Sequence, residues 1–149
     1  MEKKHQVYLS LGANLGDRAT VIQEAIRLIG ERVGKVVRCS SLIETEPWGF
    51  ESTNKFLNAA VCCATTKTPR EVLTLTQQIE RDLGKTQEHA TKRPLTSHLS
   101  PLTSYHDRPI DIDILLYDDL IVDEPDLKIP HPLMYERDFV MIPLREILD

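Results

Sequence analysis

The sequence predicts an α+β fold of the ferredoxin-like type, in which a β-α-β-β-α-β order builds an antiparallel sheet with helices packed mainly on one face. Three observations support this prediction. Strand-like alternation opens the chain, two stretches carry apolar residues at helical spacing, and β-rich segments follow each of those stretches. Extra elements are expected after this core, towards the C-terminus.

The N-terminal half predicts a strand, a helix and two further strands. Residues 7–11 alternate between apolar and other side chains, as in a half-buried strand, and segment 12–17 is expected to break that strand. Apolar residues from 21 to 29 recur with helical spacing. Segments 35–45 and 56–65 are both rich in residues that favour strands.

The C-terminal half begins with a strong helix start at residues 68–71, Thr-Pro-Arg-Glu. Threonine can cap the helix, proline suits its first turn, and the glutamate three residues later completes a capping box. Gly84 is expected to end this helix. Residues 110–117 form the clearest strand of the chain, and a short apolar helix is expected near 139–147.

Composition points to one small domain spanning residues 1–149. A formal net charge of −5 argues against a nucleic-acid partner, and no apolar stretch approaches the roughly 20 residues of a membrane helix. The N-terminus does not resemble a signal peptide. Cys39, Cys62 and Cys63 make a poor disulfide framework and are expected to be buried thiols in a reducing compartment. We therefore expect a single soluble, cytoplasmic domain without a membrane or nucleic-acid partner.

The most informative segment for chemistry is 110–117. Its even-numbered residues, ending with Leu116, are apolar and are expected to share one strand face. Asp111 and Asp113 would then share the other face, about 7 Å apart along the strand. Two such carboxylates suit Mg²⁺, which binds carboxylates together with substrate phosphates, and Arg108 upstream can meet those phosphates. The alternative is that both aspartates simply face water on an exposed strand.

Three other segments have chemical interpretations, but ordinary structure explains each of them at least as well when it is taken alone. Segment 12–16 lies between a strand and a helix but lacks both nucleotide fingerprints, so a plain turn with a helix cap explains it better. Phe56 and Asn58 can share a strand face and bind a flat heteroaromatic ring, or simply serve the core. His131 lies between two prolines and Arg137 follows it; structural hydrogen bonding and surface pairing are the alternatives to a phosphate site.

Taken together, the motifs resemble the 6-hydroxymethyl-7,8-dihydropterin pyrophosphokinase family. Each motif is weak alone, but they occur in the family's order and span most of the chain. The matching segments are 9–17, 44–49, 56–61, 108–115, 129–132 and 137–139.

The resemblance implies that the alcohol oxygen of the pterin attacks the β-phosphorus of ATP and that AMP is released. It implies that Asp111 and Asp113 bind two Mg²⁺ ions, and that two aromatic rings, Phe56 and Phe139, sandwich the pterin. The residues that it implies for pterin binding are Thr45, Pro47, Trp48, Gly49, Phe56, Asn58 and Phe139. Those that it implies for nucleotide binding are Glu80, Lys85, Arg108, Ile112, His131 and Arg137. Those that it implies for catalysis are Lys85, Arg108, Asp111 and Asp113.

The sequence departs from the family where the second helix is expected to end. The family usually has Gly-Arg-x-Arg there, whereas this chain has Gly-Lys-Thr-Gln at residues 84–87. Lys85 keeps one charge without the bidentate geometry of arginine, and Gln87 loses the other charge. The loop at about 85–108 is longer than usual, and the resemblance implies that it is a flexible lid over the substrates.

Two other functions stay open on the sequence. The altered segment is compatible with a non-catalytic ferredoxin-like domain that binds a pterin or nucleotide without consuming ATP. An Asp-x-Asp pair also occurs in metal-dependent glycosyl transferases, although the chain is short for one and that function leaves Phe56, Asn58 and Phe139 unexplained.

Overall fold

The computed structural model describes residues 4–14, 17–45, 56–88, 110–132 and 134–148; for Thr45 and residues 85–88 only the backbone is described. The elements follow the predicted β-α-β-β-α-β order, with the second strand divided in two and a C-terminal extension added. They are β1 (His5–Ala13), α1 (Arg18–Arg32), β2 (Lys35–Cys39), β3 (Ile43–Thr45), β4 (Phe56–Thr65), α2 (Pro69–Glu88), β5 (Asp111–Tyr117), β6 (Val122–Glu124), β7 (Leu127–Ile129), the 3₁₀ helix η2 (Met134–Glu136) and α3 (Asp138–Ile147).

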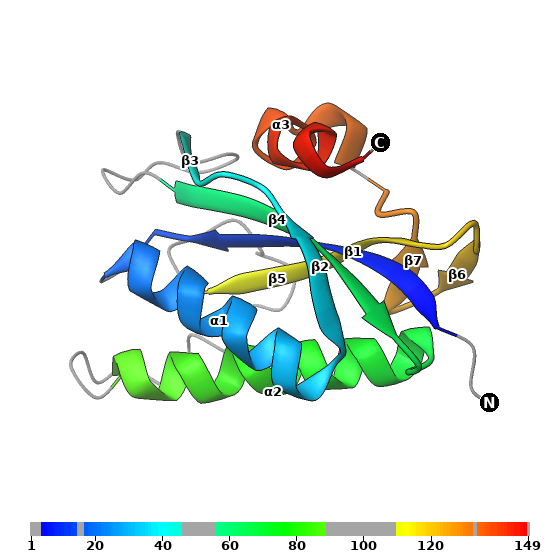
Figure 1. Cartoon of the computed structure of the whole chain (residues 1–149), viewed down its shortest axis with the longest axis horizontal. Helices are drawn as coiled ribbons and strands as arrows, with labels where there is room; N and C mark the ends of the chain where they lie inside the picture. Colours follow the sequence, from blue (N-terminus) through cyan, green and yellow to red (C-terminus); the bar gives the residue numbers. More distant parts are fainter. Residues whose placement is uncertain (1–3, 15–16, 46–55, 89–109, 133, 149) are drawn as a thin grey trace.

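The main sheet has the strand order β2-β4-β1-β5, with β3 paired beside β4, and all neighbouring strands are antiparallel. Helices α1 and α2 lie against one face, and α3 lies on the other (Figure 1). Strands β6 and β7 form a separate hairpin. The arrangement confirms the predicted ferredoxin-like fold with helices mainly on one face and extra elements at the C-terminal end.

Two apolar cores occupy the two sides of the sheet. The first core joins the sheet to α1 and α2, and contains the odd-numbered residues of β1 and β4 together with Val72 and Ile79 of α2. The second core joins the sheet to η2 and α3 through Ala60, Cys62 and Leu115. Residues that alternate along the same strands therefore pack into one core or the other, and both faces of the sheet are covered.

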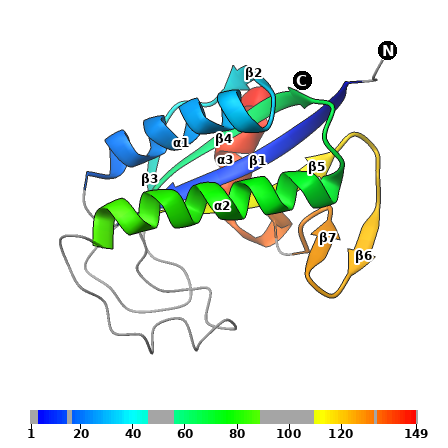
Figure 2. The same cartoon turned by 90° about the horizontal axis from the view of Figure 1, so that it is seen from below.

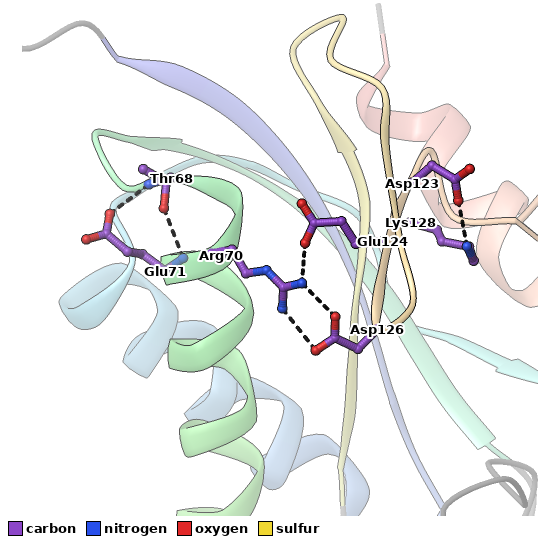
Figure 3. Close-up of polar contacts among 7 residues, drawn as sticks. All are labelled: Thr68, Arg70, Glu71, Asp123, Glu124, Asp126 and Lys128. Atoms are coloured by element: carbon purple, nitrogen blue, oxygen red, sulfur yellow. Dashed lines mark hydrogen bonds and ion pairs between the residues drawn. The ribbon is translucent and has the colours of Figure 1, made fainter.

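Helix α2 begins with the predicted capping box. The Thr68 backbone N–H donates to Glu71 Oε1 at 2.8 Å, and the Glu71 backbone N–H donates to Thr68 Oγ1 at 3.1 Å (Figure 3). Arg70 projects from the same turn to Asp126 and Glu124 of the β6–β7 hairpin, with its Nη1 2.9 Å from Asp126 Oδ2 (Figure 3). Figure 2 shows the hairpin beside this end of α2. The helix start thus also holds the hairpin in place.

Three local predictions are wrong. The helix does not end at Gly84 but continues to Glu88, since a single glycine lowers helix stability without forbidding the conformation. Strand β1 does not break at Gly12 but continues to Ala13. Cys39 is exposed, because it ends the edge strand β2, whereas Cys62 and Cys63 are buried on opposite faces of β4.

The predicted alternation of β5 holds only as far as Ile114. The β1–β5 register pairs Tyr8 with Leu116 but Leu9 with Ile114, which leaves one extra residue in β5. This bulge turns Leu115 and Leu116 towards the second core, so Leu116 does not share a face with Ile114. Asp111 and Asp113 precede the irregularity and keep the alternation that places them together.

Candidate functional site

Three neighbouring strands place a row of unlike residues across the face of the sheet on which α3 lies. Gly12 of β1 is opposite Asn58 in β4 and opposite Asp111 in β5. Ser10 is opposite Asp113, two residues further along the strand. Since neighbouring strands lie about 4.8 Å apart, the backbones of Asn58 and Asp111 are separated by roughly 10 Å, with the bare backbone of Gly12 between them.

Asn58 provides a fixed amide at one end of this row. Its side chain is buried, with 2% exposed, and its Nδ2 donates a hydrogen bond to the carbonyl oxygen of Ile43 in β3 at 3.3 Å. Phe56 lies on the same strand face, two residues earlier, and is paired in register with Thr45 of β3. The predicted aromatic ring and amide are therefore adjacent, and an amide held in this way can recognise the polar edge of a flat ring.

The N-terminus of α3 adds a second aromatic ring and a cation. Phe139 lies in the first turn of α3 and packs against the second core. The guanidinium carbon of Arg137 lies 5.7 Å from the centre of the Phe139 ring, within the range of a cation–π contact. Arg137 is 6% exposed, and this burial lowers the pKa of its guanidinium, which nonetheless stays charged at neutral pH. A buried cation next to an aromatic ring is suited to an anionic group of a ligand.

Asp111 and Asp113 stand at the other end of the row, and both are half-buried. Two aspartates on one face of a strand, about 7 Å apart, provide hard oxygen donors of the kind that Mg²⁺ shares with substrate phosphates. No group of three or more His, Cys, Asp or Glu residues that could hold a metal ion occurs among the described residues. The donor set therefore fits a metal that is completed by ligand oxygens, and not a metal enclosed by protein alone.

Glu80 and Ile112, both predicted to contact nucleotide, are joined to each other. The backbone N–H of Ile112 donates to Glu80 Oε2 at 2.7 Å, while the Ile112 side chain is buried in the first core. Strand β5 is the outer strand of the described sheet on this side, so its outward N–H needs a partner from elsewhere. The Glu80 carboxylate on α2 supplies this partner, at the residue that lies between Asp111 and Asp113 in β5.

His131 lies close to the aspartate pair. It follows the cis Ile129–Pro130 peptide, and its backbone N–H donates to the carbonyl oxygen of Leu115 in β5 at 3.1 Å. Burial lowers the pKa of its imidazole, and the charge of Asp111 acts in the opposite direction. The structure thus places a mainly neutral imidazole within electrostatic range of Asp111.

The structure brings together the predicted residues of β4, β5, the 129–131 segment and the start of α3. Pro47, Trp48, Gly49, Arg108 and most of the predicted 85–108 lid lie outside the described residues. For Thr45 and Lys85 the backbone alone is described, in β3 and in the last turn of α2.

Gly12 lies at the centre of the site, although the sequence motif 12–16 predicted a turn there. A glycine inside an alternating strand pattern was the signal that could have identified it.

Comparisons with known proteins agree with this geometry. The family model described as 7,8-dihydro-6-hydroxymethylpterin-pyrophosphokinase matches residues 8–149. The 2-amino-4-hydroxy-6-hydroxymethyldihydropteridine pyrophosphokinase of Porphyromonas gingivalis is 47% identical over 142 residues, which cover 95% of this chain and 89% of the relative. The Bacillus subtilis protein of the same name is 40% identical over 141 residues, covering 94% of this chain and 76% of the relative.

Solved structures support the fold. The crystal structure of wild-type Plasmodium falciparum HPPK-DHPS has a TM-score of 0.67 and 16% sequence identity, and the match covers 95% of this chain but 41% of that longer chain. At this identity the likeness shows the fold alone. The family match and the two bacterial relatives, in contrast, extend over nearly the whole sequence. This chain therefore belongs to the 7,8-dihydro-6-hydroxymethylpterin-pyrophosphokinase family.

Proposed function

We propose that this chain is a magnesium-dependent pyrophosphokinase that transfers pyrophosphate from ATP to 6-hydroxymethyl-7,8-dihydropterin, a step of folate biosynthesis. The family match over residues 8–149 supports this activity. The single structural observation that carries the proposal is the row formed by Asn58, Gly12 and Asp111 across three strands. It joins a ring-binding end to a carboxylate end over roughly 10 Å, which is the scale of a pterin with its hydroxymethyl arm.

The pterin ring lies, in this proposal, between Phe56 and Phe139, with its polar edge at Asn58. Stacking against aromatic rings and hydrogen bonds to a fixed amide select a flat ring that has donors and acceptors on one edge. Residues of the β3 segment and of the following segment complete the pterin site. They are Thr45, Pro47, Trp48 and Gly49.

The nucleotide lies at the β5 end of the site. We assign its phosphates to His131, Arg137, Lys85 and Arg108, and we assign two Mg²⁺ ions to Asp111 and Asp113. Bound there, the ions would neutralise triphosphate charge and hold the phosphates in place. Glu80 and Ile112, joined by their hydrogen bond, fix the outer edge of β5 beside the nucleotide.

The reaction needs positioning and charge stabilisation more than proton transfer. The alcohol oxygen of the pterin forms a bond to the β-phosphorus, and the bond from that phosphorus to the oxygen bridging the α-phosphate breaks. AMP keeps the bridging oxygen, and the hydroxyl proton is lost. Phe56, Asn58 and Phe139 orient the alcohol and Arg137 holds phosphate oxygens, while the aspartate pair would hold the ions that neutralise the phosphate charge.

The test is AMP release from ATP, followed with and without the pterin alcohol and with and without Mg²⁺. The proposal expects one AMP for each pterin diphosphate, and no AMP when either the pterin or the magnesium is omitted. Tight pterin binding without any AMP would instead support a non-catalytic binding domain, which the glutamine at position 87 keeps as the second candidate. The family assignment gives no support to the sugar-transfer hypothesis.

We also propose that the enzyme works as a cytoplasmic monomer built from one domain, with small molecules as its only partners. Among the described residues, no helix is long and apolar enough to cross a membrane. Sedimentation at micromolar concentration should give a single species of about the mass of one chain, 17.0 kDa. A dimer at that concentration would contradict the monomer proposal and leave the reaction unaffected.

A further inference from the structure

Gly12 lies where neither the backbone conformation nor the strand pairing calls for a glycine. It belongs to β1, one of the two central strands of the main sheet, and is paired on both sides. Its backbone is not in the left-handed conformation that only glycine adopts easily. Glycine weakens the interior of a strand, because it has no side chain to pack and loses much conformational freedom on folding. The reason for glycine at this position must therefore lie in the space above it.

That space opens onto the ring-binding end of the site. A Cβ atom built on Gly12 would lie 3.0 Å from Asn58 Oδ1 and 3.5 Å from Phe56 Cδ1. The contact with Phe56 is ordinary, whereas the contact with Asn58 is unusually tight and would push the buried amide by a few tenths of an ångström. A methyl group here would thus press on the Asn58 amide and fill the space beside the ring and amide that face the ligand.

We propose that Gly12 is a specificity-determining residue, whose missing side chain leaves room beside Phe56 and Asn58 for the edge of the pterin ring. This inference rests on the proposed function. The ring stands between Phe56 and Phe139 with its edge towards the β1 backbone and Asn58, and its hydroxymethyl arm is directed across β1 towards Asp111. Close approach of a ligand to bare backbone is a general reason for a glycine inside a strand.

The variant Gly12→Ala tests the proposal through binding, without turnover. The dissociation constant of 6-hydroxymethyl-7,8-dihydropterin should rise at least about tenfold, because the added methyl lifts the ring from the strand and displaces the Asn58 amide. The dissociation constant of a non-hydrolysable ATP analogue with Mg²⁺ should stay within about twofold. The matched control is Gly30→Ala, since a Cβ on Gly30 meets only Val36 Cγ2 at 3.9 Å, and this control should bind both ligands as the wild type does.

Each outcome decides the proposal. Wild-type pterin affinity in Gly12→Ala would overturn it, and so would an equal loss of affinity for both ligands, which would indicate a general structural effect. Should the variant fail to fold, NMR of the wild-type protein gives the answer. Nuclear Overhauser contacts between the Gly12 α-protons and bound pterin support the proposal, and their absence overturns it. Failure of the wild type to bind the pterin at all would overturn the proposed function along with this inference.

Discussion

The two faces of the sheet are built from the same strands but differ in chemistry. On the face towards α1 and α2, strands β1 and β4 present apolar residues throughout, from Val7 to Ala13 and from Ala59 to Cys63. On the face towards α3, the same strands contribute to an apolar core only through Tyr8, Ala60 and Cys62. Their other end presents Gly12 and Asn58, next to Asp111 of β5.

The difference shows how a small domain can combine stability with a binding site. A half-buried strand gives every second residue to each face, so one face can be devoted to packing while the other changes character along its length. The short helix α3 covers only part of its face, whereas two longer helices serve the opposite one. We therefore expect substitutions on the helix-covered face to affect folding, and substitutions at the polar end of the other face to affect chemistry.

The largest effect on folding is expected for Leu9→Ala. Leu9 is completely buried in the first core, and removing such a side chain costs about 2–5 kcal/mol of unfolding free energy. Chemical denaturation measures this loss, and turnover per folded molecule should stay close to that of the wild type. A strong loss of turnover without a loss of stability would break the proposed division between the two faces.

The largest effect on chemistry is expected for Asp113→Ala. Removing a group that stabilises charge in the reacting complex should lower turnover at least ~100-fold, equivalent to about 2.7 kcal/mol of activation free energy. The unfolding free energy should change little, because Asp113 is only half-buried and lies outside both cores. The matched control is Asp119→Ala in the exposed turn after β5, which should keep full activity. Wild-type-like turnover of Asp113→Ala would contradict the assignment of the metal site.

Much of this contrast could be predicted from the sequence, because alternation is a local property. The face shared by Asp111 and Asp113 followed directly from their spacing. The bulge that redirects Leu116 did not, because a register shift depends on how two strands meet and not on either strand alone. The extension of α2 beyond Gly84 was missed for a different reason, since the cost of one glycine is small against a helix packed along its length.

The long-range contacts of the site were also out of reach. The hydrogen bond from the Ile112 backbone to Glu80 joins residues 32 positions apart, and no local pattern indicates it. The motifs predicted which residues belong to the site, but only the tertiary structure shows which of them contact one another.

A smaller effect on stability is expected for Thr68→Ala, at the start of the helix that helps to cover the apolar face. Loss of the capping box leaves a backbone N–H of the first turn without its side-chain acceptor, which costs about 1 kcal/mol. Thermal or urea unfolding measures this change, and activity should not change. Thr74→Ala is the control, since it makes the same replacement at an exposed position inside α2, where alanine favours the helix. Equal effects of the two substitutions would show that the cap contributes nothing of its own.

The smallest effect is expected in the rates of cysteine labelling, which compare the two faces of the sheet at neighbouring residues of one strand. Cys62 and Cys63 are neighbours in β4, both fully buried, with Cys62 under α3 and Cys63 in the core beneath α1 and α2. Burial raises the pKa of Cys63 to about 12, and it also raises the pKa of Cys62, so neither thiol is ionised at pH 8.

Burial and the charge of Glu146 also raise the pKa of Cys39, but its exposure should let a thiol reagent label it first, and Cys39→Ser should remove this fast phase. The two buried thiols then react only through opening of the structure. Because a single ten-residue helix covers Cys62, its labelling should precede that of Cys63. Simultaneous labelling would mean that both faces open only in global unfolding, and that they differ in composition but not in local stability.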